Sequence, residues 1–295
     1  MIDPMPLAGR HLVGSQNEIR NNKHKHIMYS ATHITLDSAP VTTETQFGNL
    51  SPRYSHITST RIADTLRQAG WEFSDGTTRR ARTPERAAHA AHVLRFRNPA
   101  LPTINGNIIE AVMLNSHDGS TAFSLGFGVY RLACANGLVV CTANLGAIRL
   151  IHSGLNLDAV FNAATKLTDR APEVAATVER WSGTQLDHDL ALQMSSRMAR
   201  ARWGERFVEA DLLAPRRMED TRSDLWTTFN RAQESVMRGG MDVTLRKQIT
   251  VQDGTVDPVT IESTTTRRAT AIRGAMKQLR LNENLFAIAS EYAHN

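Results

Sequence analysis

Hydrophobic and polar residues alternate most regularly in the middle of the chain, where the pattern predicts an antiparallel sheet. From Ile108 to His117 the run reads as a strand with apolar residues on both faces near its middle. From Thr121 to Leu132, Phe123, Leu125, Phe127 and Val129 recur at every second position, which is the period of a β-strand. Asp118-Gly119-Ser120 separates these runs and is a turn of the kind that joins hairpin strands. A second turn at Asn136-Gly137 and a last alternating run from Ala147 to His152 extend the pattern to a meander of three or four strands.

The pattern on either side of this meander is mostly helical. Ahead of it, Ile62, Leu66 and Ala69 keep helical spacing, and Gly70 supplies a helix end before an expected strand at Trp71–Phe73. After it, apolar residues recur with the helical period in four further stretches. These predicted helices cover residues 157–181, 187–213, 224–237 and 272–288. Two short apolar runs around Asp253-Gly254 predict a protruding hairpin near 247–262.

Strands that precede helices in this way predict an α+β fold, an antiparallel β-meander core followed by a mostly helical C-terminal half. We expect three regions. Residues 1–52 would form an N-terminal arm or irregular cover, in which 27–36 could be a strand. Residues 53–153 would hold a helix and the antiparallel sheet, and 154–295 a helical region packed on that sheet.

Composition excludes several classes of protein. The 295 residues are 41% hydrophobic and 21% charged, which is typical of a folded globular chain. No apolar run approaches the roughly 18 residues that cross a bilayer, and no secretory signal is visible, so we expect no membrane partner. Cys134 and Cys141 match neither a redox pair nor a zinc knuckle and fit a reducing cytoplasm. Gly126-Phe127-Gly128 lacks the third glycine of a dinucleotide loop, and the His residues show no metal-site spacing, so we expect neither cofactor nor metal.

Arginine dominates the basic residues. Lys and Arg total 34 against 29 Asp and Glu, a net charge of +5, and only 5 of the 34 are Lys. GC-rich codon usage could produce this excess, and so could a need for the planar donors that suit phosphate. Between Asp75 and Arg97 six arginines face only two acids. That stretch is either a solvated loop followed by a polar strand edge or an arm that tracks phosphates.

Arg131 has the least expected position. It ends a strand face that consists of Phe123, Leu125, Phe127 and Val129, where a charge is costly unless it is paired or lies at the rim of the sheet. The side chain could snorkel to solvent, or it could hold a phosphate or carboxylate. The candidate nucleic-acid contacts are Arg131, Arg149, Arg79, Arg80, Arg82, Arg95 and Arg97, with Tyr130 as a stacking ring.

Ser116-His117-Asp118 contains the three residue types of a hydrolase triad. In an extended strand, however, Ser116 and Asp118 project to one face and His117 to the other, so their adjacency disfavours a triad. A turn accounts for Asp118 and Gly119 but leaves His117 unexplained. A second candidate site therefore consists of His117, Asp118, Asn136 and His152.

Two segments resemble a known family. Leu114–Ser120 and Gly128–Leu138 are similar to the phage- and plasmid-borne family described as domain of unknown function 932, as is a helix with Trp226, Asn230 and Glu234. The resemblance covers roughly Arg53 to Tyr292. It implies a phage or mobile-element setting in the cytoplasm of a bacterial host, without an assigned reaction.

We expect a protein that binds single-stranded nucleic acid, with single-stranded DNA as its partner. It would act as an annealing protein of recombination in a homo-oligomeric ring or filament. Its meander followed by a long helix is similar to the core of phage annealing proteins, and phosphate binding needs no catalytic set. One alternative is a host-takeover or anti-defence factor that binds another protein, which an exposed apolar patch would indicate. The other is a nuclease or nucleotide hydrolase that uses His117 and Asp118, which converging side chains in one pocket would indicate.

Overall fold

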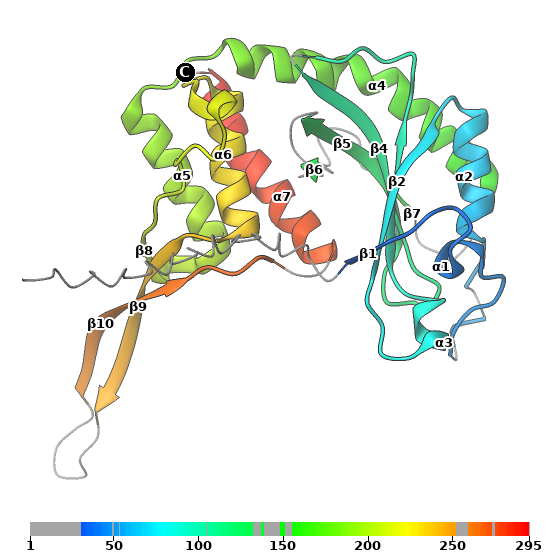
Figure 1. Ribbon diagram of the computed structural model, residues 1–295, viewed down its shortest axis with the longest axis horizontal. Coiled ribbons are helices and arrows are strands. Elements are labelled where there is room, and N and C mark those ends of the chain that lie inside the picture. The colour runs from blue at the N-terminus through cyan, green and yellow to red at the C-terminus, as the bar shows by residue number, and fades with distance from the viewer. Residues whose placement is uncertain are drawn as a thin grey trace, which may run out of the picture.

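The computed structural model describes residues 31–48, 50–52, 54–104, 106–131, 137–138, 148–150, 155–251, 259–272 and 275–294. It confirms the α+β fold: an antiparallel sheet lies in the N-terminal half, and helices with a smaller sheet make up most of the C-terminal half (Figure 1).

The large sheet has seven strands. Its order is β1-β2-β3-β4-β5-β6, with β7 paired to β5, and every pairing is antiparallel. The strands are β1 (Ala31–His33), β2 (Glu72–Arg79), β3 (His92–Arg97), β4 (Asn107–Asn115), β5 (Phe123–Arg131), β6 (Gly137–Leu138) and β7 (Ile148–Leu150). Of these, β4 and β5 match the predicted alternation closely, whereas β3 lies in the arginine-rich stretch.

One face of this sheet builds the main core. Because side chains alternate along a strand, Leu94 and Phe96 of β3 share this face with Met113 of β4 and with Phe123 and Phe127 of β5. All five side chains are buried. The helices α2 (Ser59–Gln68) and α4 (Leu157–Gly183) pack against one another, and α4 also contacts β4 and β5 (Figure 1).

Helix α4 connects the sheet to the helices that follow. It is continuous through the exposed Pro172 and, at 27 residues, about 40 Å long. Its last turns bury Trp181, which stacks on Phe286 with ring centroids 4.6 Å apart and meets Phe229 edge to face at 5.5 Å. This aromatic cluster holds α4 to α6 (Leu225–Arg238) and α7 (Ala275–Ser290), and α5 (His188–Trp203) packs against both of those helices. Short elements link or follow them: α1 (Ala39–Thr42), α3 (Pro84–Ala87), η2 (Gly204–Arg206), η3 (Met218–Thr221) and η4 (Glu291–His294).

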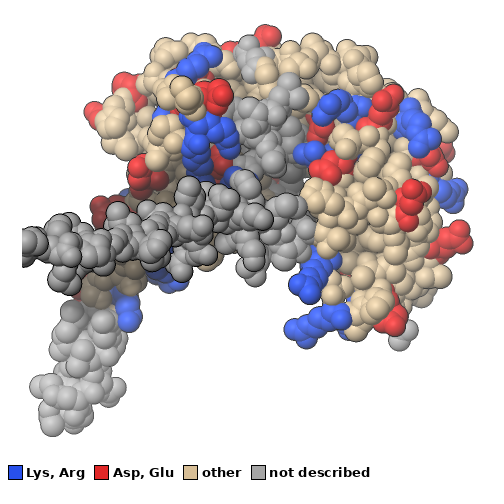
Figure 2. Space-filling model, in the orientation of Figure 1, with Lys and Arg blue, Asp and Glu red and all other residues tan. Residues whose placement is uncertain are grey.

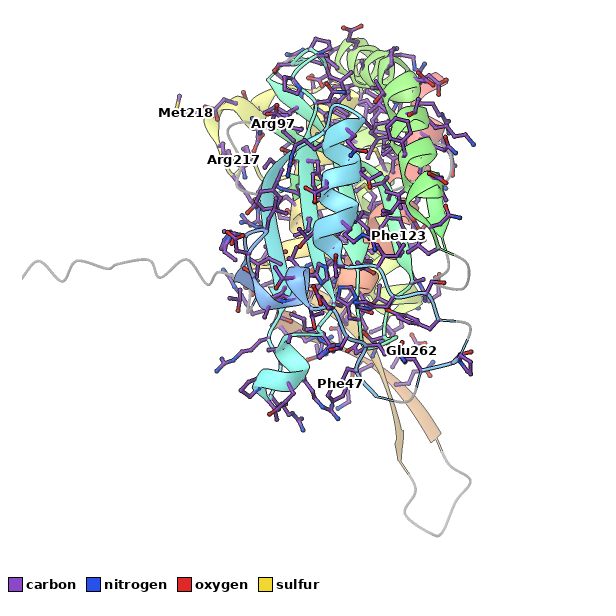
Figure 3. The ribbon with its side chains drawn as sticks, turned by 90° about the vertical axis from the view of Figure 1, so that its right-hand side faces the viewer. Phe47, Arg97, Phe123, Arg217, Met218 and Glu262 are labelled. Carbon is purple, nitrogen blue, oxygen red and sulfur yellow. The ribbon has the colours of Figure 1, made fainter. Side chains whose placement is uncertain are left out.

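Two predicted elements differ from the structure. The helix expected over 187–213 ends at Trp203, because Gly204 adopts a φ of 67° that ends the helix, and the chain continues through η2 into β8 (Phe207–Glu209). The predicted hairpin is also longer than expected. Its strands are β9 (Asp242–Val251) and β10 (Val259–Arg268), which form a second sheet with β8 and project away from the rest of the molecule (Figures 1 and 3).

Candidate functional site

A buried polar network lies where α2 begins beside the ends of β3 and β4. Ser59 is the first residue of α2, after its N-cap Thr58. Its Oγ lies 2.8 Å from Nε2 of His92 and accepts a hydrogen bond of 2.9 Å from Nδ2 of Asn115. Nε2 of His117 lies 3.4 Å from the same oxygen. None of these four side chains is more than 1% exposed.

The protonation of this network follows from its surroundings. Burial lowers the pKa of His92 to about 4, although the hydrogen bond to the carbonyl of Ala90 and the charge of Asp118 act in the opposite direction. The ring is therefore neutral at pH 7. Its Nδ1 lies 3.0 Å from the Ala90 carbonyl oxygen, so Nδ1 carries the proton and Nε2 accepts the hydrogen bond from Ser59.

Asp118 is directed away from His117. Its Oδ1 accepts the N–H of Ser120 at 2.9 Å, and its Oδ2 lies 3.7 Å from the guanidinium of Arg79. Burial raises the pKa of Asp118, but hydrogen bonds with Ser120 and Ser116 and the charge of Arg79 outweigh that effect and lower the pKa. His117 instead lies inside, with its ring 4.7 Å from that of His56.

This geometry suits a structural network better than a reaction centre. Ser59 and His92 resemble a nucleophile and its base, but both are closed off from any substrate. The hydrogen bonds of Ser59 with His92 and Asn115 fix the first turn of α2 to β3 and β4. Within the described ranges, no group of three His, Cys, Asp or Glu side chains could hold a metal ion. The other two residues of this predicted site, Asn136 and His152, lie outside the described residues.

The arginines predicted to track phosphates are largely engaged with acids. Arg95 pairs with Asp75 at 3.1 Å and with the buried Glu110 at 3.3 Å. Arg97 reaches the same Glu110 at 3.2 Å. Arg80 and Arg82 are exposed and form no ion pair with another described residue. Figure 2 shows basic and acidic side chains mixed over the coloured part of this face of the molecule.

The remaining predicted contacts lie at the two ends of β5. In the backbone register, Arg131 pairs with Asn107 and Tyr130 with Ile108, whereas Arg149 pairs with Ser124. Seven residues of extended strand separate Ser124 from Arg131, about 23 Å. One compact site therefore does not include both arginines. The side chains of Tyr130, Arg131 and Arg149 lie outside the described part of the chain.

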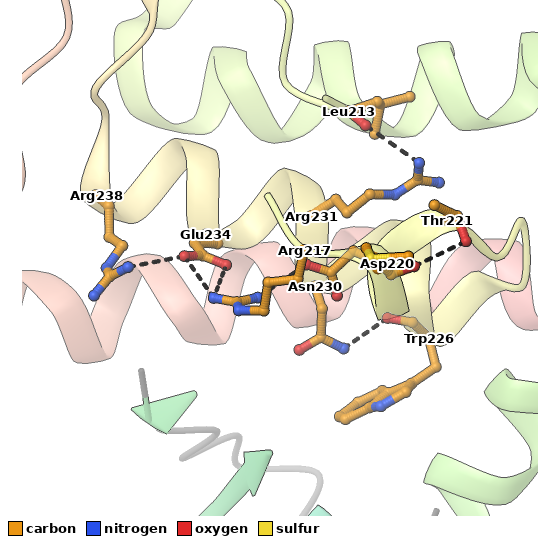
Figure 4. Close-up of polar contacts among 10 residues, drawn as sticks. Leu213, Arg217, Asp220, Thr221, Trp226, Asn230, Arg231, Glu234 and Arg238 are labelled. Atoms are coloured by element: carbon orange, nitrogen blue, oxygen red, sulfur yellow. Dashed lines mark hydrogen bonds and ion pairs between the residues drawn. The ribbon is translucent and has the colours of Figure 1, made fainter. Parts of the chain in front are cut away.

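The helix with Trp226, Asn230 and Glu234 anchors the segment before it. Glu234 accepts hydrogen bonds from Arg217, at 2.9 and 3.0 Å, and from Arg238, at 2.9 Å (Figure 4). Arg217 also bonds the buried Asp220 of η3 at 2.9 Å. The spacing of Glu234 and Arg238, four residues apart on one helix, was visible in the sequence, whereas their partner Arg217 was not.

Sequence reasoning missed a cationic concavity between α5 and α7. Its volume is about 810 Å³, and none of the described residues that line it is acidic. The lining residues are Ala201, Arg202, Thr270, Ala271, Ile272, Lys277, Arg280, Leu281 and Asn284. Arg202 stacks over Trp203 at 4.5 Å and donates to the carbonyl oxygens of Val236 and Thr270. Lys277 and Arg280, three residues apart on α7, are exposed.

The C-terminal half exposes four further cations that do not line the concavity. They come from the end of α5, from η2 and from both strands of the hairpin, and none forms an ion pair with another described residue. They are Arg200, Arg206, Lys247 and Arg267.

Taken together, the chain is an α+β protein with a buried polar network at one end of its sheet and a cationic surface on its C-terminal half. The DUF932 model, described as a domain of unknown function, matches residues 46–283, and the chain belongs to this family. Two relatives from Escherichia coli K12, the UPF0380 proteins YfjQ and YafZ, are each 30% identical over 204 residues, which cover 68% of this chain and 74% of theirs. No solved structure matches the chain. Among the described residues, no helix is both long and apolar enough to cross a membrane.

Proposed function

We propose that this protein binds single-stranded nucleic acid and that the cationic concavity between α5 and α7 holds the strand. The observation that carries the proposal is the lining of that concavity, where the described residues include Arg202, Lys277 and Arg280 and no acid. Phosphate contacts supply most of the sequence-independent affinity of such proteins, and they need only cationic and polar donors.

The rest of the lining favours a single strand over a duplex. Ile272, Leu281 and Ala201 give the concavity an apolar component beside its cations. Bases of a single strand can lie on apolar surface, whereas those of a duplex are stacked inside it. Large exposed aromatic side chains are rare in the described part of the chain, where Phe161 on α4 is the clearest case. Binding would therefore depend on phosphates more than on stacked rings, which predicts little sequence preference.

A salt series tests the proposal. The full chain is titrated into a labelled single-stranded oligonucleotide at several salt concentrations, and fluorescence anisotropy reports the dissociation constant. The double variant Lys277→Ala/Arg280→Ala should weaken binding by about tenfold or more. It should also lower the slope of log K against log salt by about 1.4, since each phosphate contact on a single strand contributes about 0.7.

The matched control is Lys166→Ala/Arg180→Ala. These two cations lie on α4, are exposed and form no ion pair with another described residue. Replacing them removes the same amount of charge as the test variant. We expect the control to retain the affinity of the natural chain. Absence of salt-dependent binding at low ionic strength would refute the proposal, and equal losses in both double variants would refute the site.

Binding a single strand is not sufficient for a role in annealing. An annealing protein must accelerate pairing of complementary strands, so the rate of duplex formation between two labelled oligonucleotides tests this role separately. Arg131, Arg149 and Tyr130 stay predicted contacts, and an Arg131→Ala variant in the same anisotropy assay tests the most specific of them.

A further inference from the structure

In the part of the chain that the structure describes, no strand lies beside the outer edge of β10. In the order β10-β9-β8, β10 has one neighbour, and its ten-residue register with β9 runs from Val259–Val251 to Arg268–Asp242 without interruption. Beyond Thr244 and Leu245, no described strand lies on the opposite side of β9 either. Most of the hairpin is thus a two-stranded ribbon, an arrangement that is marginally stable in water without a further strand.

The directions of the backbone groups along β10 follow from one hydrogen bond. Ala269, one position past the register, donates its N–H to the carbonyl of Met241 at 2.8 Å. Hydrogen-bonded positions alternate along an antiparallel pair. The N–H and C=O groups of the even-numbered residues from Glu262 to Arg268 are therefore directed to the free edge. No proline or bulge interrupts this stretch, and all four of these side chains are exposed.

We infer that β10 pairs antiparallel with β10 of a second copy of this chain, with the twofold axis at Thr265. A twofold axis perpendicular to the ribbon pairs residues whose numbers have the same parity, so the even-numbered residues face one another and form the new hydrogen bonds. With the axis at Thr265, Glu262 lies opposite the partner's Arg268, and Thr264 lies opposite the partner's Thr266.

Charge complementarity favours this register and favours a second copy of the chain as the pairing strand. The pairing places an acid opposite a base twice and puts Arg267 opposite the partner's Ser263, so no like charges face one another. Within one copy, Arg268 lies 3.7 Å from Asp242 and Glu262 lies 3.9 Å from Arg246. Across the joined ribbons, each Arg268 would lie between Asp242 of its own copy and Glu262 of the other. Moving the axis to Thr264 would put Glu262 opposite the partner's Thr266 and lose both charge pairs. Figure 3 shows Glu262 on the projecting hairpin, clear of the body of the molecule.

A charge exchange tests the inference. Sedimentation velocity of the natural full chain, without nucleic acid, should show a dimer that forms with increasing concentration. Glu262→Arg and Arg268→Glu should each weaken dimerisation by about tenfold, because like charges then face one another. An equimolar mixture of the two variants should restore it, since every arginine in the mixed pair meets a glutamate.

Cysteine cross-linking locates the axis. In the proposed pair, the Thr265 residues of the two copies lie opposite one another at a non-hydrogen-bonded position. Cα atoms at such positions lie about 4.5 Å apart, which is within the range of a disulfide. Thr265→Cys should therefore give a disulfide-linked dimer under mild oxidation. Ser263→Cys is the matched control, because its two copies would be offset by four residues, about 13 Å.

Different results would contradict the dimer and the register. A natural chain that stays monomeric at high concentration would overturn the inference, and so would single charge variants that dimerise as well as the natural chain. Failure of the mixed variants to associate, or equal cross-linking of both cysteine variants, would overturn the Thr265 register. Circular dichroism of each variant establishes that the fold is retained.

Discussion

The sheet end and the C-terminal surface use polar residues in opposite ways. At the sheet end, His92 and Asn115 are buried and both form hydrogen bonds with the hydroxyl of Ser59, inside the molecule. On the C-terminal half, Lys277 and Arg280 are exposed beside a concavity whose described lining residues include no acid. Polar groups of the first kind stabilise the fold, whereas those of the second kind remain available to a ligand. Substitutions at the sheet end should therefore change the stability of the protein, and substitutions of the cations on the C-terminal surface should change its binding of a ligand.

The largest effect is expected from Ser59→Ala. Removing this hydroxyl leaves the Nδ2 donor of Asn115 and Nε2 of His92 without their closest partner inside the protein. Each such buried group costs about 1–3 kcal/mol, so the free energy of unfolding should fall by about 2–4 kcal/mol in urea denaturation. Ser74→Ala, an exposed serine of β2, is the control and should change stability little. Nucleic-acid affinity of the folded variant should be unchanged, and a large loss of affinity would contradict the division between the two regions.

Acid should destabilise the protein through His92. Its pKa is about 4 in the folded chain and 6.5 ordinarily, so between these values the unfolded chain binds the proton more tightly. Stability contributed by the neutral ring is therefore present above pH 6.5 and is lost as the pH falls toward 4, by about 3 kcal/mol. Urea midpoints across this range measure the loss. His92→Gln cannot titrate, so its stability should depend less steeply on pH, and equal slopes in the two proteins would argue against this assignment.

The smallest effect on stability is expected from Lys277→Ala/Arg280→Ala. Both side chains are exposed, and neither forms an ion pair with another described residue, so the free energy of unfolding should change by less than about 0.5 kcal/mol. The same variant should show the large loss of oligonucleotide affinity described above. A destabilisation comparable to that of Ser59→Ala would mean that these cations support the fold, and the contrast would then fail.

Much of the fold was predictable because its signals are local. Alternating side chains and the Asp118-Gly119 turn predict β4 and β5, and the helical period predicts α2 and α6. The end of α5 was not predicted, because the apolar period continues past Trp203 while the backbone of Gly204 ends the helix. The strand β3 was predicted only as one of two alternatives, a polar strand edge after a loop, because its arginines also fitted an arm that tracks phosphates. The structure pairs Arg95 of this strand with Asp75 and Glu110.

The candidate sites were less predictable, because they depend on which charges meet. His117 and Asp118 are neighbours in sequence and diverge in the structure, since one side chain joins the buried network and the other turns toward Arg79. The cationic concavity draws Arg202 from α5 and Lys277 and Arg280 from α7, which no spacing rule connects.

By itself, the sequence determined the α+β class, the central turn, the principal helices and the resemblance to the DUF932 family, because periodicity, turn chemistry and motifs are properties of neighbouring residues. Only the tertiary structure decided which arginines form ion pairs, which histidines are buried and which of the described cations are exposed without an acidic partner. Those outcomes depend on desolvation and on contacts between residues far apart in the chain. The total charge of the protein was therefore known from the start, and only the fold showed which of the described cations are exposed without an acidic partner.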